Sequence, residues 1–160
     1  MSFRVGFGFD VHRLSEGVDL WLGGIKVPHA KGSVGHSDAD VLIHAICDAL
    51  LGAANLGDIG LHFPDTSQEF KGIDSKILLA RVMDLMRKNR CRVGNVDVTL
   101  CLEKPKISPC IPDMKKALAS VMNIGEDDIS IKATTNEKLG YVGREEGVAA
   151  YAVVLIEKPR

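Results

Sequence analysis

The sequence predicts an α+β domain of two layers, in which helices pack on one face of a mixed four-stranded sheet. Strand-like and helix-like segments are interleaved along the chain, and the first strand is followed by a short hairpin. The last apolar run, residues 148–156, has the character of a strand that is buried on both faces. Since a two-layer domain leaves one face of its sheet bare, we expect sheets of neighbouring subunits to cover that face in a homo-oligomer.

The first strand is predicted over residues 3–12, where the side chains alternate between two faces. One face is entirely apolar and comprises Val5, Phe7, Phe9 and Val11. The other face carries two glycines followed by a carboxylate and an imidazole, namely Gly6, Gly8, Asp10 and His12. Bare glycines on a strand indicate that another group packs or binds closely there.

The next segments predict a hairpin, a loop and a long helix. Residues 20–27 form the hairpin and turn at Gly23-Gly24, and the polar, glycine-containing residues 28–36 read as a loop. The helix is predicted over 37–56, with Ser37 in a capping arrangement and Gly57 as its stop. Because this helix is apolar around much of its circumference, we expect it to be deeply packed.

The second half of the chain alternates again between the two kinds of element. Asp74 is a suitable N-cap for the second helix, and Pro112 suits the first turn of the third. The predicted order after the first helix is a loop at 57–73, a helix at 75–89, a strand at 95–103, a loop at 104–111, a helix at 112–123, a strand at 129–134, a glycine-rich loop and a strand at 147–157.

Composition excludes several classes of protein. The length predicts one domain, residues 1–160, and the formal net charge of −1 indicates neither a nucleic-acid footprint nor a polybasic membrane patch. No run approaches the about 20 apolar residues of a membrane-spanning helix, and no targeting segment is visible, so we expect a cytoplasmic protein. The four cysteines (Cys47, Cys91, Cys101 and Cys110) lack CxxC spacing, which is typical of reduced thiols.

Asp10 and His12 point to the same side of the first strand and are suitable ligands for a divalent metal. His44, inside the first helix, is the candidate third ligand, although a hydrogen-bonded core imidazole is the alternative interpretation. Asp48 lies four residues later on the same face and is placed to orient His44 or to activate a nearby group. Three protein ligands with an open fourth position are typical of catalytic zinc.

Three loops are suited to phosphate or sugar groups, although each of them also reads as a solvated turn. Residues 132–144 combine hydroxyls, cations and glycines at the end of a strand, and residues 58–66 offer carboxylates for sugar hydroxyls. Lys104 and Lys106 are suitable for contacting a nucleotide. Polar residues that recur after apolar strands favour a site at these loops.

Several blocks of sequence, in the same order, resemble the 2-C-methyl-D-erythritol 2,4-cyclodiphosphate synthase family. The resemblance covers essentially the whole chain. It rests on residues 8–12, on 36–41 with His44 and Asp48, on 57–60, 63–66, 94–99, 105–106 and 132–135, and on Glu137, Gly140, Gly143 and Arg144.

The resemblance implies a phosphorus-oxygen lyase of the non-mevalonate isoprenoid pathway. It implies conversion of 4-diphosphocytidyl-2-C-methyl-D-erythritol 2-phosphate into the 2,4-cyclodiphosphate with release of CMP. The family forms homotrimers with active sites at the subunit interfaces, and in some members an isoprenoid diphosphate occupies the central cavity. In this context Gly6 and Gly8 are interpreted as leaving room for a neighbouring subunit or for the diphosphate.

Residue roles also follow from the resemblance. Asp10, His12 and His44 match zinc ligands, and Glu137 matches the ligand of a second divalent ion, Mg²⁺ or Mn²⁺. His36 and Thr135 match groups that stabilise the transition state, and Asp48 joins them as a catalytic candidate. The implied substrate contacts are Ser37, Asp58, Ile59, Gly60, Phe63, Pro64, Asp65, Thr66 and Ser67 on the first half, and Leu102, Lys106, Ala133, Thr134, Tyr141 and Arg144 on the second.

Two other functions are compatible with these residues. A metal-dependent phosphoesterase acting on a nucleotide diphosphate has the same ligands but yields linear phosphates. A trimeric protein that only binds an isoprenoid diphosphate, with a vestigial site, is the alternative without catalysis. The intact set of Asp10, His12, His44 and Glu137 argues against that last alternative.

Overall fold

The structure is a computed structural model that describes residues 1–159. Single-turn 3-10 helices lie at Gln68–Phe70, Ser108–Cys110 and Glu126–Asp128. The strands and α-helices, in chain order, are β1 (Ser2–Glu16), β2 (Leu20–Leu22), β3 (Ile25–Val27), β4 (Lys31–Val34), α1 (Val41–Ala54), α2 (Ile59–His62), α3 (Ser75–Lys88), β5 (Arg92–Cys101), α4 (Ile111–Met122), β6 (Ile129–Thr134), α5 (Gly140–Gly143) and β7 (Gly147–Lys158).

The predicted mixed sheet is present, but it has five strands rather than four, in the order β4-β1-β7-β5-β6. Within residues 1–159, only the β5–β6 pair of this sheet is parallel. The additional strand is β4, within residues predicted to be a loop. It forms because β1 continues beyond residue 12 to Glu16, and its end pairs with Lys31–Val34. The polar composition of β4 is typical of a loop. It becomes a strand because the end of β1 has free backbone hydrogen-bonding groups with which it pairs.

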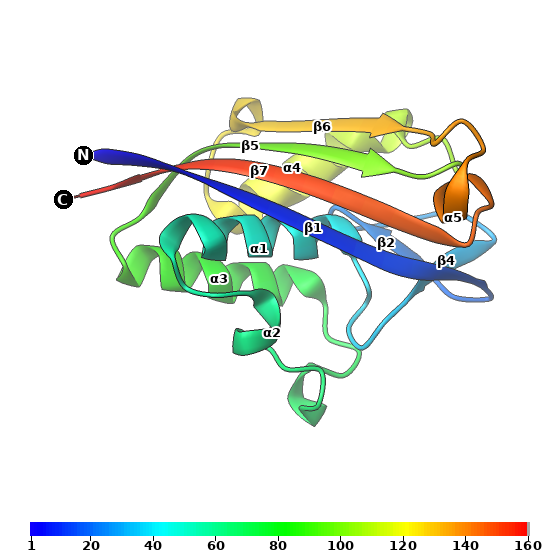
Figure 1. Cartoon of the computed structure of the whole chain (residues 1–160), viewed down its shortest axis with the longest axis horizontal. Helices are drawn as coiled ribbons and strands as arrows, with labels where there is room; N and C mark the ends of the chain where they lie inside the picture. The colour runs from blue at the N-terminus through cyan, green and yellow to red at the C-terminus, as the bar shows by residue number, and fades with distance from the viewer. Residues whose placement is uncertain (160) are drawn as a thin grey trace.

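The helices form the second layer. Figure 1 shows α1 and α3 together on one side of the long strands, and both the α1–β1 and the α1–α3 contacts are extensive. The two ends of the chain lie side by side, since Ser2 pairs with Lys158 across β1 and β7. The α+β, two-layer interpretation is therefore confirmed. Among residues 1–159, no helix is both long and apolar enough to cross a bilayer.

Helix α1 starts later than predicted, at Val41 rather than Ser37. Ala39 has a left-handed backbone (φ 58°), which interrupts helical geometry before the helix begins. The N-cap is the fully buried Asp40, whose carboxylate accepts hydrogen bonds from the backbone N–H of Ile43 and of both turn glycines at 2.7–3.1 Å. The helix ends at Ala54, and the residue that caps it is Asn55 (φ 59°) and not Gly57.

The glycine face of β1 is covered by α1. A β-carbon on Gly6 or Gly8 would lie only 1.8–1.9 Å from the carbonyl oxygen of Ala49 or Ala45, respectively. The expectation of a close neighbour is thus confirmed. The neighbour is a helix of the same chain, which corrects the interpretation that these glycines leave room for another subunit or for a diphosphate.

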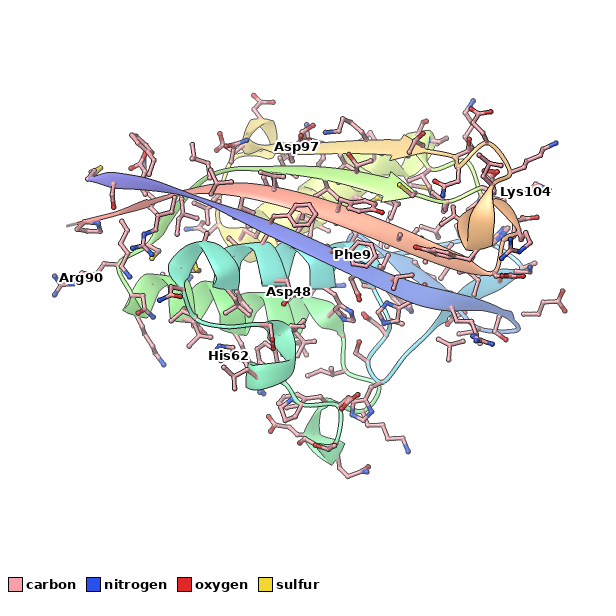
Figure 2. The ribbon with its side chains drawn as sticks, viewed as in Figure 1. Phe9, Asp48, His62, Arg90, Asp97 and Lys104 are labelled. Atoms are coloured by element: carbon pink, nitrogen blue, oxygen red, sulfur yellow. The ribbon has the colours of Figure 1, made fainter. Side chains whose placement is uncertain are left out.

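The opposite face of β1 carries the large apolar side chains, and it is bare. Phe7 is 62% exposed and Val5 is 67% exposed, while Phe9, labelled in Figure 2, packs against Tyr151 of β7 with ring centroids 5.1 Å apart. By contrast, the helix-facing side of β7 is fully buried at Ala150, Ala152, Val154 and Ile156. One chain therefore covers only one face of its sheet.

The remaining elements lie close to their predicted positions. The strand at 129–134 has the predicted bounds, and α3 begins after Asp74, whose side chain accepts from the N–H of Lys76 at 2.8 Å. The Gly-Asp-Pro-rich segment 57–73 includes the one-turn helix α2 and a 3-10 turn. These short helices shape the loop beside the site.

Candidate active site

Asp10, His12 and His44 meet at one point between β1 and α1. The Oδ2 atom of Asp10 lies 3.1 Å from His12 Nδ1 and 3.0 Å from His44 Nδ1. Each residue offers one ligand atom, and these atoms all lie within 4.8 Å of one another. Alternation on β1 directs Asp10 and His12 to the same face, and α1 brings His44 onto that face because the two glycines allow a close approach.

The chemistry of this group fits a divalent metal. In a tetrahedral zinc site with bonds of about 2.0–2.1 Å, ligand atoms lie roughly 3.3 Å apart. In addition, His12 Nδ1 is buried and, within residues 1–159, makes no hydrogen bond of normal geometry, although Asp10 is nearby. A buried imidazole nitrogen that lacks a hydrogen-bond partner and faces a carboxylate and a second imidazole is suited to metal ligation.

The electrostatics of the group favour an ionised Asp10. Burial alone would raise its pKa, but the close contacts and charges of His12 and His44 outweigh burial and lower the pKa to about 2. The pKa of His44 is raised, because Asp10, Asp40 and Asp38 favour its cationic form more than burial opposes it. The carboxylates around His44 thus make this position electrostatically favourable for a cation.

A cavity of about 500 Å³ opens beside these three residues. It is lined by the predicted catalytic residue His36 and by the predicted substrate residues Ser37, Ile59, Gly60, Phe63, Pro64, Asp65 and Thr66. Val34, Gly35, Phe70 and Leu78 also line it and were not predicted. Nothing in their local sequence pattern distinguishes them from ordinary loop or core residues, so only the fold identifies them.

The loop on the far side of this cavity is held by hydrogen bonds from its neighbours. Asp48, on the side of α1 near α2 in Figure 2, accepts from the N–H of Ile59 at 2.7 Å. Burial raises the pKa of Asp48, and the Ile59 N–H only partly offsets this. His36 Nε2 donates to the carbonyl oxygen of Ser67 at 2.9 Å. Asp58 caps α2 through the N–H of Leu61 and does not line the cavity.

The predicted nucleotide residues line a second cavity of about 350 Å³, which shares no lining residue with the first. It lies at the ends of the parallel strands β5 and β6 and includes Leu102, Lys106, Ala133, Thr134 and Thr135. Glu137 follows in a turn with a left-handed backbone (φ 52°), and its N–H donates to Thr135 Oγ1 at 3.3 Å.

Tyr141 and Arg144 belong to neither cavity. Tyr141 lines a third hollow together with Arg13 and Lys31, and Arg144 is paired with Glu146 at 3.1 Å on the surface. The structure therefore brings the three predicted zinc ligands together, and it spreads the other predicted residues over separate hollows and the surface between them.

The chain as a whole matches a known family. The model of the YgbB family matches residues 3–157. This chain belongs to the YgbB family.

Relatives that match over nearly their whole length carry one name. The 2-C-methyl-D-erythritol 2,4-cyclodiphosphate synthase of Phocaeicola vulgatus is 66% identical over 158 residues, which are 99% of this chain and 99% of that one. The synthase of Cytophaga hutchinsonii is 61% identical and is covered completely. The resemblance to the 2-C-methyl-D-erythritol 2,4-cyclodiphosphate synthase family seen in the sequence is thus confirmed along the chain.

Solved structures agree with the fold. The bifunctional IspDF of Campylobacter jejuni superposes with a TM-score of 0.95 at 39% identity and covers 99% of this chain, while this chain spans 43% of IspDF. The IspF of Plasmodium falciparum, solved as a CDP complex, superposes with a TM-score of 0.86 at 34% identity, with 99% of this chain and 98% of that one covered.

One group at this site was not predicted from the sequence. Ser75, at the start of α3, contacts His44 on the side of the ring opposite to Asp10. Its position directly after the Asp74 cap reads as an ordinary helix start, and it lies 31 residues from His44. No local pattern could have linked the two residues.

Proposed function

We propose that this chain converts 4-diphosphocytidyl-2-C-methyl-D-erythritol 2-phosphate into 2-C-methyl-D-erythritol 2,4-cyclodiphosphate and CMP, as a phosphorus-oxygen lyase of the non-mevalonate pathway. The observation that carries the proposal is the Asp10, His12 and His44 centre, which opens into a cavity beside a polar loop. The reaction forms a bond between a 2-phosphate oxygen and the β-phosphorus, and it breaks the bond from that phosphorus to the oxygen that leaves with CMP.

The ligand set supports zinc at this centre. Two imidazoles and one carboxylate are typical of catalytic zinc, which keeps one position open for substrate. Glu137 would hold a second ion, Mg²⁺ or Mn²⁺, since such ions are bound by one or two carboxylates together with substrate phosphates. When bound, such ions act as Lewis acids that neutralise charge on phosphate oxygens.

The remaining residues bind and orient the anionic substrate. His36 and Thr135 are the proposed donors near the charge that develops during the transfer, and the loss of one such donor typically raises the barrier by about 2.7–4 kcal/mol. Asp48 acts as a positioning residue, because its hydrogen bond to Ile59 holds the loop of the first cavity. No side-chain nucleophile is required, because the attacking group belongs to the substrate.

The proposed assembly is a homotrimer in which each active site combines residues of two subunits. The support is twofold. The proposed methylerythritol and cytidine residues line separate cavities of one chain, and the outer face of the sheet exposes Phe3, Val5, Phe7, Val11 and Val153. An isoprenoid diphosphate in a central cavity near Tyr141 and Arg144 stays a prediction that depends on this assembly.

Phe7→Lys is expected to disrupt the trimer and to abolish most of the activity, because a charge at the centre of this face cannot be buried without a large penalty. Mass measurement by light scattering should change from three chains to one. Ile77→Lys is the matched control: it also replaces an exposed apolar residue, 47% exposed, but on α3. A Phe7→Lys protein that stays trimeric and active would contradict this assembly.

The activity itself is tested by phosphorus NMR of the product formed from the cytidine diphosphate ester in the presence of zinc and Mg²⁺. We expect the signals of a cyclic diphosphate together with CMP in equal amounts. Two linear phosphate products would instead indicate a phosphoesterase. An absence of turnover by the metal-loaded trimer would favour the binding protein without catalysis.

A further inference from the structure

The His44 ring is held on both sides. Its Nδ1 faces Asp10 Oδ2 at 3.0 Å, and its Nε2 faces two hydroxyls, Ser75 Oγ at 3.0 Å and Ser37 Oγ at 3.1 Å. The first side belongs to the proposed metal centre. The proposed reaction assigns no role to the contacts of Nε2 with these two hydroxyls.

Ser75 connects His44 to a carboxylate. Its side chain is fully buried, its hydroxyl makes a short hydrogen bond with Asp38 Oδ1, and its backbone N–H donates to Asp38 Oδ2 at 2.9 Å. An ionised carboxylate only accepts hydrogen bonds, so the Ser75 hydroxyl must donate its proton to Asp38. The Oγ lone pairs are then left to accept, and the donor they face is Nε2–H of His44.

Asp38 is itself rigidly placed. Its Oδ1 also accepts from the N–H of Asp40 at 3.1 Å, and its own N–H donates to the carbonyl oxygen of Ile73 at 3.0 Å. A further backbone bond joins the N–H of Gly72 to the carbonyl oxygen of His36 at 2.7 Å. The start of α3 and the segment before α1 are therefore joined where they meet His44.

We propose that Ser75 and Asp38 are positioning residues of the metal centre, an inference that rests on the proposed function. Asp38 holds the Ser75 hydroxyl so that it accepts from Nε2–H, which leaves the Nδ1 lone pair of His44 free for the metal. Partners of this kind orient metal-bound imidazoles, and their loss typically weakens metal affinity 10–100-fold. Asp48, which the sequence suggested for this task, instead contacts Ile59.

Ser37 contributes less to this arrangement. Its hydroxyl accepts from the N–H of Ala39 at 3.2 Å, and its distance to Ser75 Oγ is 3.4 Å. Unlike the buried Ser75, Ser37 is partly exposed and lines the cavity. Its hydroxyl is therefore available to substrate, whereas that of Ser75 is committed to Asp38 and His44.

The test is the zinc dissociation constant of the full-length protein, measured by competition with a chelating indicator after metal removal. Ser75→Ala should weaken zinc binding about 10–100-fold, because Ala keeps the helix start and the backbone bond to Asp38 but removes the acceptor. Ser120→Ala, an exposed serine of α4, is the matched control and should bind zinc as the unmodified protein does. The visible spectrum of the Co²⁺-loaded protein should change in Ser75→Ala and not in the control, which reports the ligand geometry directly.

Asp38→Asn completes a double-mutant cycle. If Asp38 acts through the serine, Asp38→Asn should weaken zinc binding in the presence of Ser75 and have less than about a twofold effect once Ser75 is alanine. Strictly additive effects of the two substitutions would overturn the proposal, as would a Ser75→Ala protein that binds zinc as tightly as the control.

Folding and the proposed function are checked separately. The melting temperature of each metal-free variant tests whether it folds. If Ser75→Ala does not fold, the Asp38→Asn variant is sufficient by itself, and an unchanged zinc affinity in that variant overturns the proposal. Failure of the unmodified protein to bind zinc would instead contradict the metal centre of the proposed function, before any variant is considered.

Discussion

His44→Ala is expected to remove stoichiometric zinc and to lower turnover by roughly 10³-fold or more. His44 supplies one of three protein ligands, and the two ligands that remain, Asp10 and His12, bind zinc much more weakly. Loss of a metal that neutralises phosphate charge raises a barrier by several kcal/mol, and each 1.36 kcal/mol is about tenfold in rate. Metal analysis and steady-state kinetics on the same preparation check both effects together.

His29→Ala is the matched control for this experiment. His29 lies between β3 and β4 and lines none of the three cavities described above. It should leave zinc content and turnover unchanged. A His44→Ala protein with full turnover would refute the metal assignment, and one that retains zinc but loses turnover would show that His44 acts on substrate rather than on the metal.

Gly8→Ala is expected to destabilise the fold by about 3 kcal/mol or more. Its β-carbon would lie 1.9 Å from the carbonyl oxygen of Ala45 and 2.8 Å from the N atom of Ala49, and both are backbone atoms of α1. The strand and the helix must therefore separate along their length. For a chain of this size, 3 kcal/mol corresponds to a decrease of roughly 6–12 °C in melting temperature.

Gly52→Ala provides a control of opposite sign. It makes the same substitution within α1, where nothing lies within 4 Å of the new β-carbon. Alanine is favoured over glycine in a helix by about 0.5–1 kcal/mol, so this variant should melt slightly higher than the unmodified protein. The prediction for Gly8 is wrong if Gly8→Ala melts as high as Gly52→Ala.

The Gly8 substitution also tests how the site is assembled. Asp10 is on β1 and His44 is on α1, and only close contact between these elements brings their ligand atoms to 3.0 Å. We therefore expect zinc affinity to decrease in Gly8→Ala even at temperatures where the protein is folded. Titration with zinc well below the melting temperature measures this effect.

Local sequence was sufficient where an element depends on its own residues. The Asp74 cap and the apolar stripe after it place α3 almost as predicted, and the alternation in β1 correctly puts Asp10 and His12 on one face. Local sequence was insufficient at α1, where the N-cap is Asp40 and not the predicted Ser37. Asp40 is preferred because it also receives hydrogen bonds from Gly23 and Gly24, which lie in a distant turn.

By itself, the sequence determined the family, the order of the elements and the three candidate metal ligands, because caps, alternation and motif blocks are local properties. Only the tertiary structure decided which face of β1 meets α1 and that Lys31–Val34 forms a fifth strand. It also decided that Ser75 contacts the Nε2 atom of His44 and is itself hydrogen-bonded to Asp38. These features depend on backbone approach and on hydrogen bonds between residues that lie 15 to 43 positions apart. A periodicity of 2 or 3.6 residues specifies the faces of an element but not the partner that each face will meet.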